Sequence, residues 1–93
     1  MNNQELLDKI AYNVSLGNIN VSYPGHNHKL KGQPGVVELM RTALDQKIDP
    51  KKIIVKALSK PMEEVTEKFE SDTYLAPHIL ISAKCVGDAM DML

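Results

Sequence analysis

The sequence has little cysteine, no tryptophan and no marked excess of either charge. Its 93 residues include one cysteine, which cannot form an internal disulfide, so we expect a fold that needs none. The formal net charge is −1 and acidic and basic residues are interspersed, which argues against nucleic acid as a partner. No apolar run approaches the ~20 residues of a membrane span, and the first residues lack the basic-then-apolar layout of a secretory signal. We therefore expect a soluble cytoplasmic protein, with neither a membrane nor nucleic acid as a partner.

Apolar residues recur at spacings of three and four along most of the chain, and this spacing predicts helices. The length fits one domain, which we assign to residues 1–93. The first predicted helix ends at Gly17, a residue type that commonly follows a helix. The apolar stripe of this helix comprises Leu6, Leu7, Ile10 and Val14.

Residues 18–34 are rich in glycine, proline and asparagine and show no sustained period, so we predict a loop there. The loop is long for so small a domain, and this length favours a functional or mobile segment. A second amphipathic helix follows, with an apolar stripe formed by Val36, Val37, Leu39, Met40, Ala43 and Leu44.

The third predicted helix runs from Pro50 to about Glu70. Asp49 suits the cap of this helix, and Pro50 suits its first position, where the N–H has no helical partner. Pro61 lies inside the helix, where it removes a hydrogen bond and clashes with the preceding turn. We therefore expect a kink near residues 58–60.

The last predicted helix begins at Pro77, after a polar corner at residues 70–76. Together the four segments predict an all-α fold, a small antiparallel four-helix bundle with a kinked third helix. The apolar stripe predicted for the last helix comprises Ile79, Leu80, Ala83, Val86, Ala89 or Met90, and Leu93.

Histidine and cysteine offer few candidates for chemistry. His26 and His28 present two imidazoles, but no nearby cysteine or second histidine pair completes four ligands, so a solvated loop is favoured over a metal site. Cys85 needs a base and an orienting group to act as a nucleophile, and its place on the apolar side of the last helix favours an inert core thiol. His78 is interpreted as a surface histidine in the first turn of that helix.

Carboxylates and phosphate-binding loops complete the search for a site. Four glutamates of the third helix suggest paired carboxylates, but they lie opposite an apolar face, which favours a solvated side. Glycine-rich phosphate loops are absent. We predict no catalytic residue and no metal site. The four glutamates are Glu63, Glu64, Glu67 and Glu70.

A series of short motifs in residues 44–93 carries a family resemblance. In chain order these are Ile48, Asp49 and Pro50; Ala57 and Leu58; Pro61 and Met62; Val65 with Glu67 to Phe69; Tyr74 and Pro77; and Ser82, Ala83 and Met90. The combination resembles the N-terminal helical domain of the corrinoid proteins that serve methylamine, methanol and related methyltransferases. That module is similar to the cobalamin-capping helical domain of methionine synthase. Residues 3–16 and 36–43 match more loosely.

The resemblance implies a non-catalytic cap. In this family the corner before the last helix faces the methyl-bearing side of a corrinoid and shields the cobalt–carbon bond from water during methyl transfer between methyltransferases. Apolar side chains on rigid helices suit this task, because the bond needs a dry surrounding without a competing nucleophile. Carried over by position, the residues that face the cofactor are Met62, Val65, Phe69, Ala76 and Ile79.

Several positions depart from the family pattern. Ala76 is small where the family usually has a larger apolar residue, which implies a looser lid. Thr66 and Asp72 replace glycines, and Lys47 replaces the glycine that often ends the second helix. The loop at 18–34 is longer than the family's connection.

The resemblance further implies a cobalamin-binding Rossmann-like domain, which is absent from this chain together with its Asp-x-His-x-x-Gly segment. Residues 26–32 do not replace that segment, because His26 stands where an aspartate is needed. We therefore expect no corrinoid on this chain alone, and partners in a separate corrinoid-binding domain and a cognate methyltransferase. The alternative is a stand-alone helical interaction module, whose exposed apolar corner would favour a homodimer.

Overall fold

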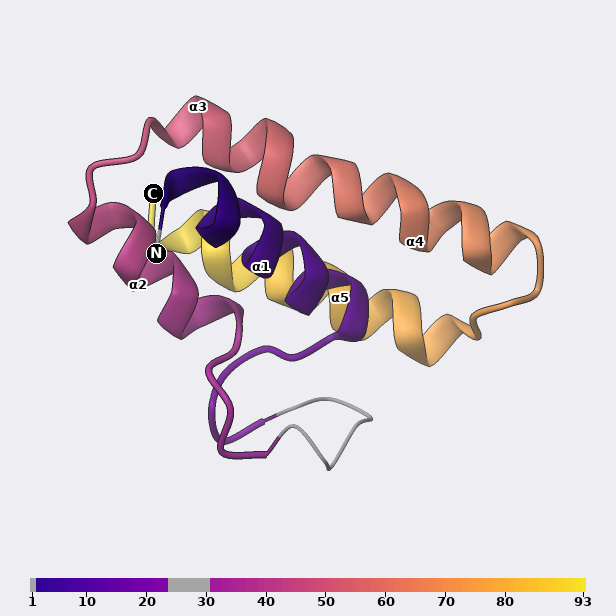
Figure 1. Cartoon of the computed structure of the whole chain (residues 1–93). Helices are drawn as coiled ribbons and strands as arrows, with labels where there is room; N and C mark the ends of the chain where they lie inside the picture. The colour runs from indigo at the N-terminus through magenta and orange to yellow at the C-terminus, as the bar shows by residue number, and fades with distance from the viewer. Residues whose placement is uncertain (1, 24–30) are drawn as a thin grey trace.

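The structure, a computed structural model, describes residues 2–23 and 31–93. Figure 1 shows helices packed side by side, with α3 and α4 lying along one continuous helical run. The described residues thus form four helical rods, and the prediction of a small all-α four-helix fold is confirmed. The elements are α1 (Asn3–Leu16), α2 (Val36–Asp45), α3 (Pro50–Lys52), the π-helical segment η2 (Ile53–Ser59), α4 (Lys60–Glu70) and α5 (Ala76–Asp91).

Helix ends fall where local chemistry predicts them. Gly17 ends α1 in the left-handed region, with φ 74°, a conformation that costs glycine little. The Asp49 carboxylate accepts a hydrogen bond from the Lys51 backbone N–H at 3.0 Å, and Pro50 fills the first position of α3. Proline at the start of the run and glycine after α1 therefore act as the sequence predicts.

Helix α1 is the centre of the bundle. It contacts α2, η2, α4 and α5, and its predicted apolar stripe is buried. Since a helix of this length is marginal alone, packing on this stripe supplies most of its stability. The other residues of the main core are Ile19, Val36, Leu39, Met40, Ala43, Ile48, Ile53, Ala57, Leu58, Cys85 and Ala89.

The helical run at residues 50–70 changes its hydrogen-bond pattern ahead of Pro61. Residues 53–59 are π-helical, and the α-helix resumes at Lys60. Proline has no N–H to donate, and its ring would clash with the carbonyl four residues earlier, that of Ala57. A wider π turn, with bonds to the fifth residue, is one way to accommodate this. The kink and the antiparallel order of the helices stay predictions.

The apolar stripe predicted for α5 was only partly right, because Ala89 is buried and Ile79 and Val86 are partly buried. Leu80 is 68% exposed, and Ala83, Met90 and Leu93 are exposed as well. The buried face consists of Ser82, Cys85 and Ala89, with Ile81, Val86 and Met92 partly buried beside it. Apolar residues lie on several faces of α5, so periodicity alone does not choose between them. The face with the smaller side chains is the one that lies against the core.

Residues 65–80 form a projecting arm, which comprises the end of α4, the turn and the start of α5. In Figure 1 these segments extend beyond the end of α1. Val65 is buried there, 1% exposed, but lies outside the main core cluster. The arm therefore contains buried apolar packing outside the main core.

Within the described part of the chain, no helix is long and apolar enough to cross a membrane.

The residue after α2 generates a prediction about stability. Lys47 has φ 59°, in the left-handed region where a side chain costs roughly 1–2 kcal/mol. The family resemblance expects glycine at this position, and the backbone supplies the reason. We expect Lys47→Gly to raise the free energy of unfolding by about 1 kcal/mol in urea titrations, because the strain is relieved.

The neighbouring Gln46 provides the matched control. Its φ is −81°, which any residue adopts, so Gln46→Gly brings only the higher entropy of the unfolded chain. That variant should be less stable than the wild type. Equal effects of the two substitutions would contradict the strain at Lys47.

Cys85 generates a prediction about reactivity. It is fully buried, and burial, followed by the charge of Asp88, raises the pKa of its thiol to about 12 from 9.0. Since the thiolate is the reactive form, a disulfide reagent at pH 8 should leave the folded protein unmodified and label it in urea. Between about pH 9 and pH 12 the unfolded chain loses the thiol proton while the folded chain keeps it, so this group lowers stability as pH rises. Ser71→Cys, at an exposed position, is the positive control, and rapid labelling of native Cys85 would contradict the burial.

Candidate functional site

The residues expected to face a cofactor all lie on the arm or next to it, but they differ in exposure. Phe69 is 40% exposed at the end of α4, although it is the sole phenylalanine and a natural core residue. Val65, one turn before it, is buried beneath the surface. Ala76 is exposed at the start of α5, whereas Met62 and Ile79 are partly buried. Phe69 and Ala76 are therefore accessible to solvent, whereas Val65 is not.

Two exposed leucines of the arm were not among the predicted site residues. Leu75, directly before α5, is 73% exposed, and Leu80 lies in the second turn of that helix. The two leucines lie on either side of Pro77. In the sequence, this pair of leucines around a predicted helix start was the available signal for an exposed apolar surface. Exposed apolar side chains on one small element are more informative than isolated ones, because they mark contact surfaces.

The polar groups of the turn are engaged with one another. The Ser71 hydroxyl lies 3.2 Å from the Lys68 backbone carbonyl and 3.1 Å from the Thr73 hydroxyl. Asp72 occupies the left-handed region with φ 62°, a conformation that aspartate tolerates better than most residues. The family resemblance expects glycine here too. Hydrogen bonds within the turn hold its hydroxyl groups in place and shape the corner.

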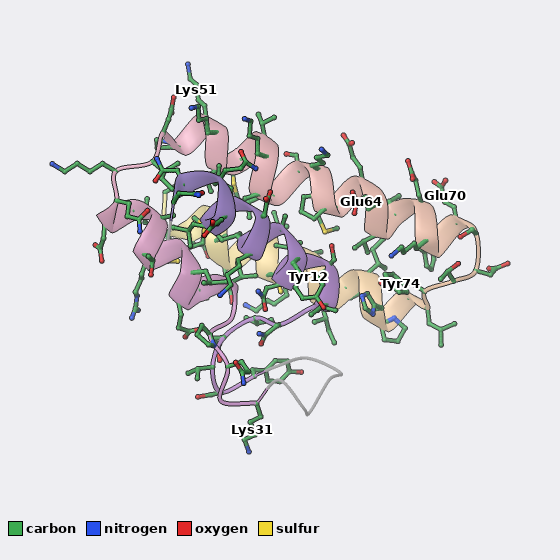
Figure 2. All side chains as sticks on the ribbon, viewed as in Figure 1. Tyr12, Lys31, Lys51, Glu64, Glu70 and Tyr74 are labelled. Atoms are coloured by element: carbon green, nitrogen blue, oxygen red, sulfur yellow. The ribbon has the colours of Figure 1, made fainter. Side chains whose placement is uncertain are left out.

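His78 is a connection between helices rather than the surface histidine that was predicted. It is partly buried, and its Nε2 lies 2.8 Å from the Ser15 backbone carbonyl at the end of α1. Its ring stacks on Tyr74, with centroids 3.8 Å apart and planes inclined by 22°. The Lys68 ammonium lies 5.0 Å from the centre of the Tyr74 ring, on the opposite side of the turn in sequence. Figure 2 shows Tyr74 at the base of α5, beside the start of that helix.

The remaining candidates contribute no chemistry in the described residues. His26 and His28 lie outside these residues. Elsewhere, no group of three or more histidine, cysteine, aspartate or glutamate side chains is placed to hold a metal ion in the described part. Cys85 is buried with a raised pKa, as expected for an inert core thiol. The predicted solvated side of α4 is confirmed, because all four of its glutamates are exposed: Glu63, Glu64, Glu67 and Glu70.

Comparison with known proteins places the chain in a family. Residues 33–93 match the family described as "B12 binding domain". The full chain is 33% identical to Monomethylamine corrinoid protein 1 of Methanosarcina acetivorans and also 33% identical to the protein of that name from Methanosarcina barkeri. Over 56 residues, 60% of this chain, it is 34% identical to Trimethylamine corrinoid protein 1 of Methanosarcina acetivorans, where these residues are 26% of the length. No solved structure matches the chain.

The extent of the match decides what it establishes. The chain spans 36% of the length of the monomethylamine corrinoid proteins, and all 93 of its residues are covered. Residues 50–70 and 76–91 are helical, in agreement with the helical domain that the motifs at residues 44–93 resemble. On the strength of the family match over residues 33–93 and the identity over the full chain, this protein belongs to the helical cap domains of methylamine corrinoid proteins.

Proposed function

We propose that the arm covers the methyl-bearing face of a corrinoid and keeps water from it while a methyl group passes between methyltransferases. The observation that carries this proposal is the exposure of Phe69 on a helix end that projects beyond α1. A phenylalanine that served only the core would be expected in the main cluster, where the cost of leaving it exposed is avoided. Phe69 lies outside that cluster.

The residues of the arm fit an apolar macrocycle. Phe69 and Leu75 each expose an apolar side chain, and Ala76 adds a small one next to Leu75 in the chain. When bound by its own domain, a corrinoid supplies the metal centre that carries the methyl group. This chain would cover that centre without ligating it, because its contribution is exclusion of water by side chains on two rigid helices.

The polar groups near this surface have hydrogen-bond partners of their own. The hydroxyl groups of Ser71 and Thr73 bond within the turn, and the Tyr74 hydroxyl lies 3.4 Å from the Lys68 ammonium. The His78 Nε2 is directed to Ser15 on α1. We infer that the chain is non-catalytic and that its role is protective.

The partners follow from this role. We propose that the arm docks on a corrinoid-binding domain and moves aside when a cognate methyltransferase approaches. Without such a domain, the exposed apolar side chains of the arm favour pairing of two copies of this chain. A corrinoid is not expected on this chain alone.

Replacement of Phe69 tests the cap. A corrinoid-binding domain loaded with methylcobalamin is mixed with this chain, and association is followed by pull-down and by the corrinoid absorption spectrum. We expect the wild type to associate and to slow solvent access to the cobalt, and Phe69→Ala to do neither. Because Phe69 is partly exposed and outside the main core, Phe69→Ala should lower the free energy of unfolding by only about 1 kcal/mol.

Tyr12 supplies the matched control. It is an exposed aromatic residue on α1, at 64%, outside residues 65–80, and Figure 2 shows it on that helix. Tyr12→Ala should behave as the wild type in both readouts. If Phe69→Ala associates normally, or if it loses about 3 kcal/mol or more as a core phenylalanine would, the proposed cap is wrong.

Ala76 tests the same surface in the opposite direction. Ala76→Leu restores the larger apolar residue that the family resemblance expects at this exposed position. The stability of the chain alone should change by less than about 0.5 kcal/mol, because a surface position away from the core is altered. We expect slower solvent access to the cobalt in the mixture described above. An unchanged rate would show that Ala76 does not lie in the contact.

A further inference from the structure

A chain of contacts links the arm to α1, and it runs through His78. The Lys68 ammonium on α4 lies near the Tyr74 ring, that ring stacks on His78, and the His78 Nε2 reaches the Ser15 carbonyl. Ser15 and His78 are 63 residues apart in sequence. These contacts connect the α4 part and the α5 part of the arm to the end of α1.

The Ser15 carbonyl lies at the end of α1, where carbonyl groups need hydrogen-bond donors from outside the helix. The last carbonyl groups of a helix have no donor within the helix. At the end of α1, the Gly17 N–H donates to the Val14 carbonyl and the Asn18 N–H to the Asn13 carbonyl. The next donor along the chain, the Ile19 N–H, bonds the Tyr23 carbonyl at 3.2 Å.

His78 therefore supplies the donor for Ser15. The Ser15 oxygen belongs to a carbonyl group and can only accept, so the His78 Nε2 carries the hydrogen. In effect α5 caps the end of α1 with a side chain. The contact fixes the base of the arm at the point where the arm leaves the bundle.

We propose that His78 is a positioning residue that sets the orientation of the arm, and hence of Phe69, relative to the bundle. Within residues 65–80, Val65 is buried whereas Phe69, Leu75 and Leu80 are exposed, so apolar packing restrains this segment less than it restrains the main core. A flat ring held by a stack and a hydrogen bond allows little rotation. The relevance of this orientation to a corrinoid rests on the proposed function, whereas the restraint itself does not.

The distance between the arm and α1 reports the restraint directly. Because Cys85 is buried, Glu70→Cys and Asp8→Cys, both at exposed helical positions, allow selective spin labelling of the end of α4 and of α1, and pulsed dipolar spectroscopy gives the distribution of distances. We expect one narrow distribution for the wild type and a broader, shifted one for His78→Ala. His78→Gln should restore the narrow distribution, because its amide can donate to the same carbonyl.

Tyr74→Phe is the matched control. It keeps the stacked ring but removes the hydroxyl near Lys68, so the distribution should stay narrow. An unchanged distribution in His78→Ala with retained helicity would overturn the proposal. Should His78→Ala fail to fold, nitrogen NMR of the wild-type imidazole decides, since a ring with its hydrogen on Nδ1 and none on Nε2 would also overturn it.

The association assay separates the two proposals. If the wild type caps the corrinoid, His78→Ala should bind several-fold more weakly with Phe69 intact, and His78→Gln should recover the binding. Normal binding by a His78→Ala chain with a broadened distribution would overturn the role of His78 in positioning Phe69. If the wild type does not associate while His78→Ala still broadens the distribution, the restraint stands and the proposed function fails.

Discussion

The burial of one apolar stripe on α1 organises the rest of the molecule. Every other rod contacts this helix, directly or through η2, because its stripe needs cover on several sides. A core of this kind depends on short distances between helices. The buried residues of α5, Ser82, Cys85 and Ala89, are small and allow such a close approach. The length of α1 limits how far this core reaches. Helical chain that continues beyond its end must be held by other means, and α4 with the start of α5 is the segment concerned (Figure 1).

The parts of the fold that depend on local chemistry were predictable. The stop at Gly17, the cap by Asp49 and the start at Pro50 each follow from a single residue's backbone or side chain. The buried face of α5 was predicted only in part, because apolar residues such as Leu80 and Ile81 lie on adjacent faces and only the neighbouring helices choose between them. The burial of small residues is only weakly visible in a sequence.

The site residues likewise divide into features that the sequence predicts and features that depend on tertiary contacts. Family resemblance located Phe69, Ala76 and Ile79 on one projecting element, but exposure depends on how far that element extends past α1, which no motif encodes. The contact between His78 and Ser15 joins distant parts of the chain through a backbone carbonyl, and a carbonyl leaves no trace in the sequence. The left-handed backbone at Lys47 and Asp72 was visible only as two departures from an expected glycine.

The π-helical segment η2 makes the length of the run at 50–70 as important as its composition. A π turn holds more residues than an α turn, so η2 absorbs extra chain while the helix continues. If this segment became a regular α-helix without losing a residue, the extra residue would turn everything after it by about 100° around the helix axis. Val65 would then leave the interior of the arm, and Phe69 would point elsewhere. The direction in which the arm presents its phenylalanine is thus fixed by a hydrogen-bond pattern that lies outside the arm.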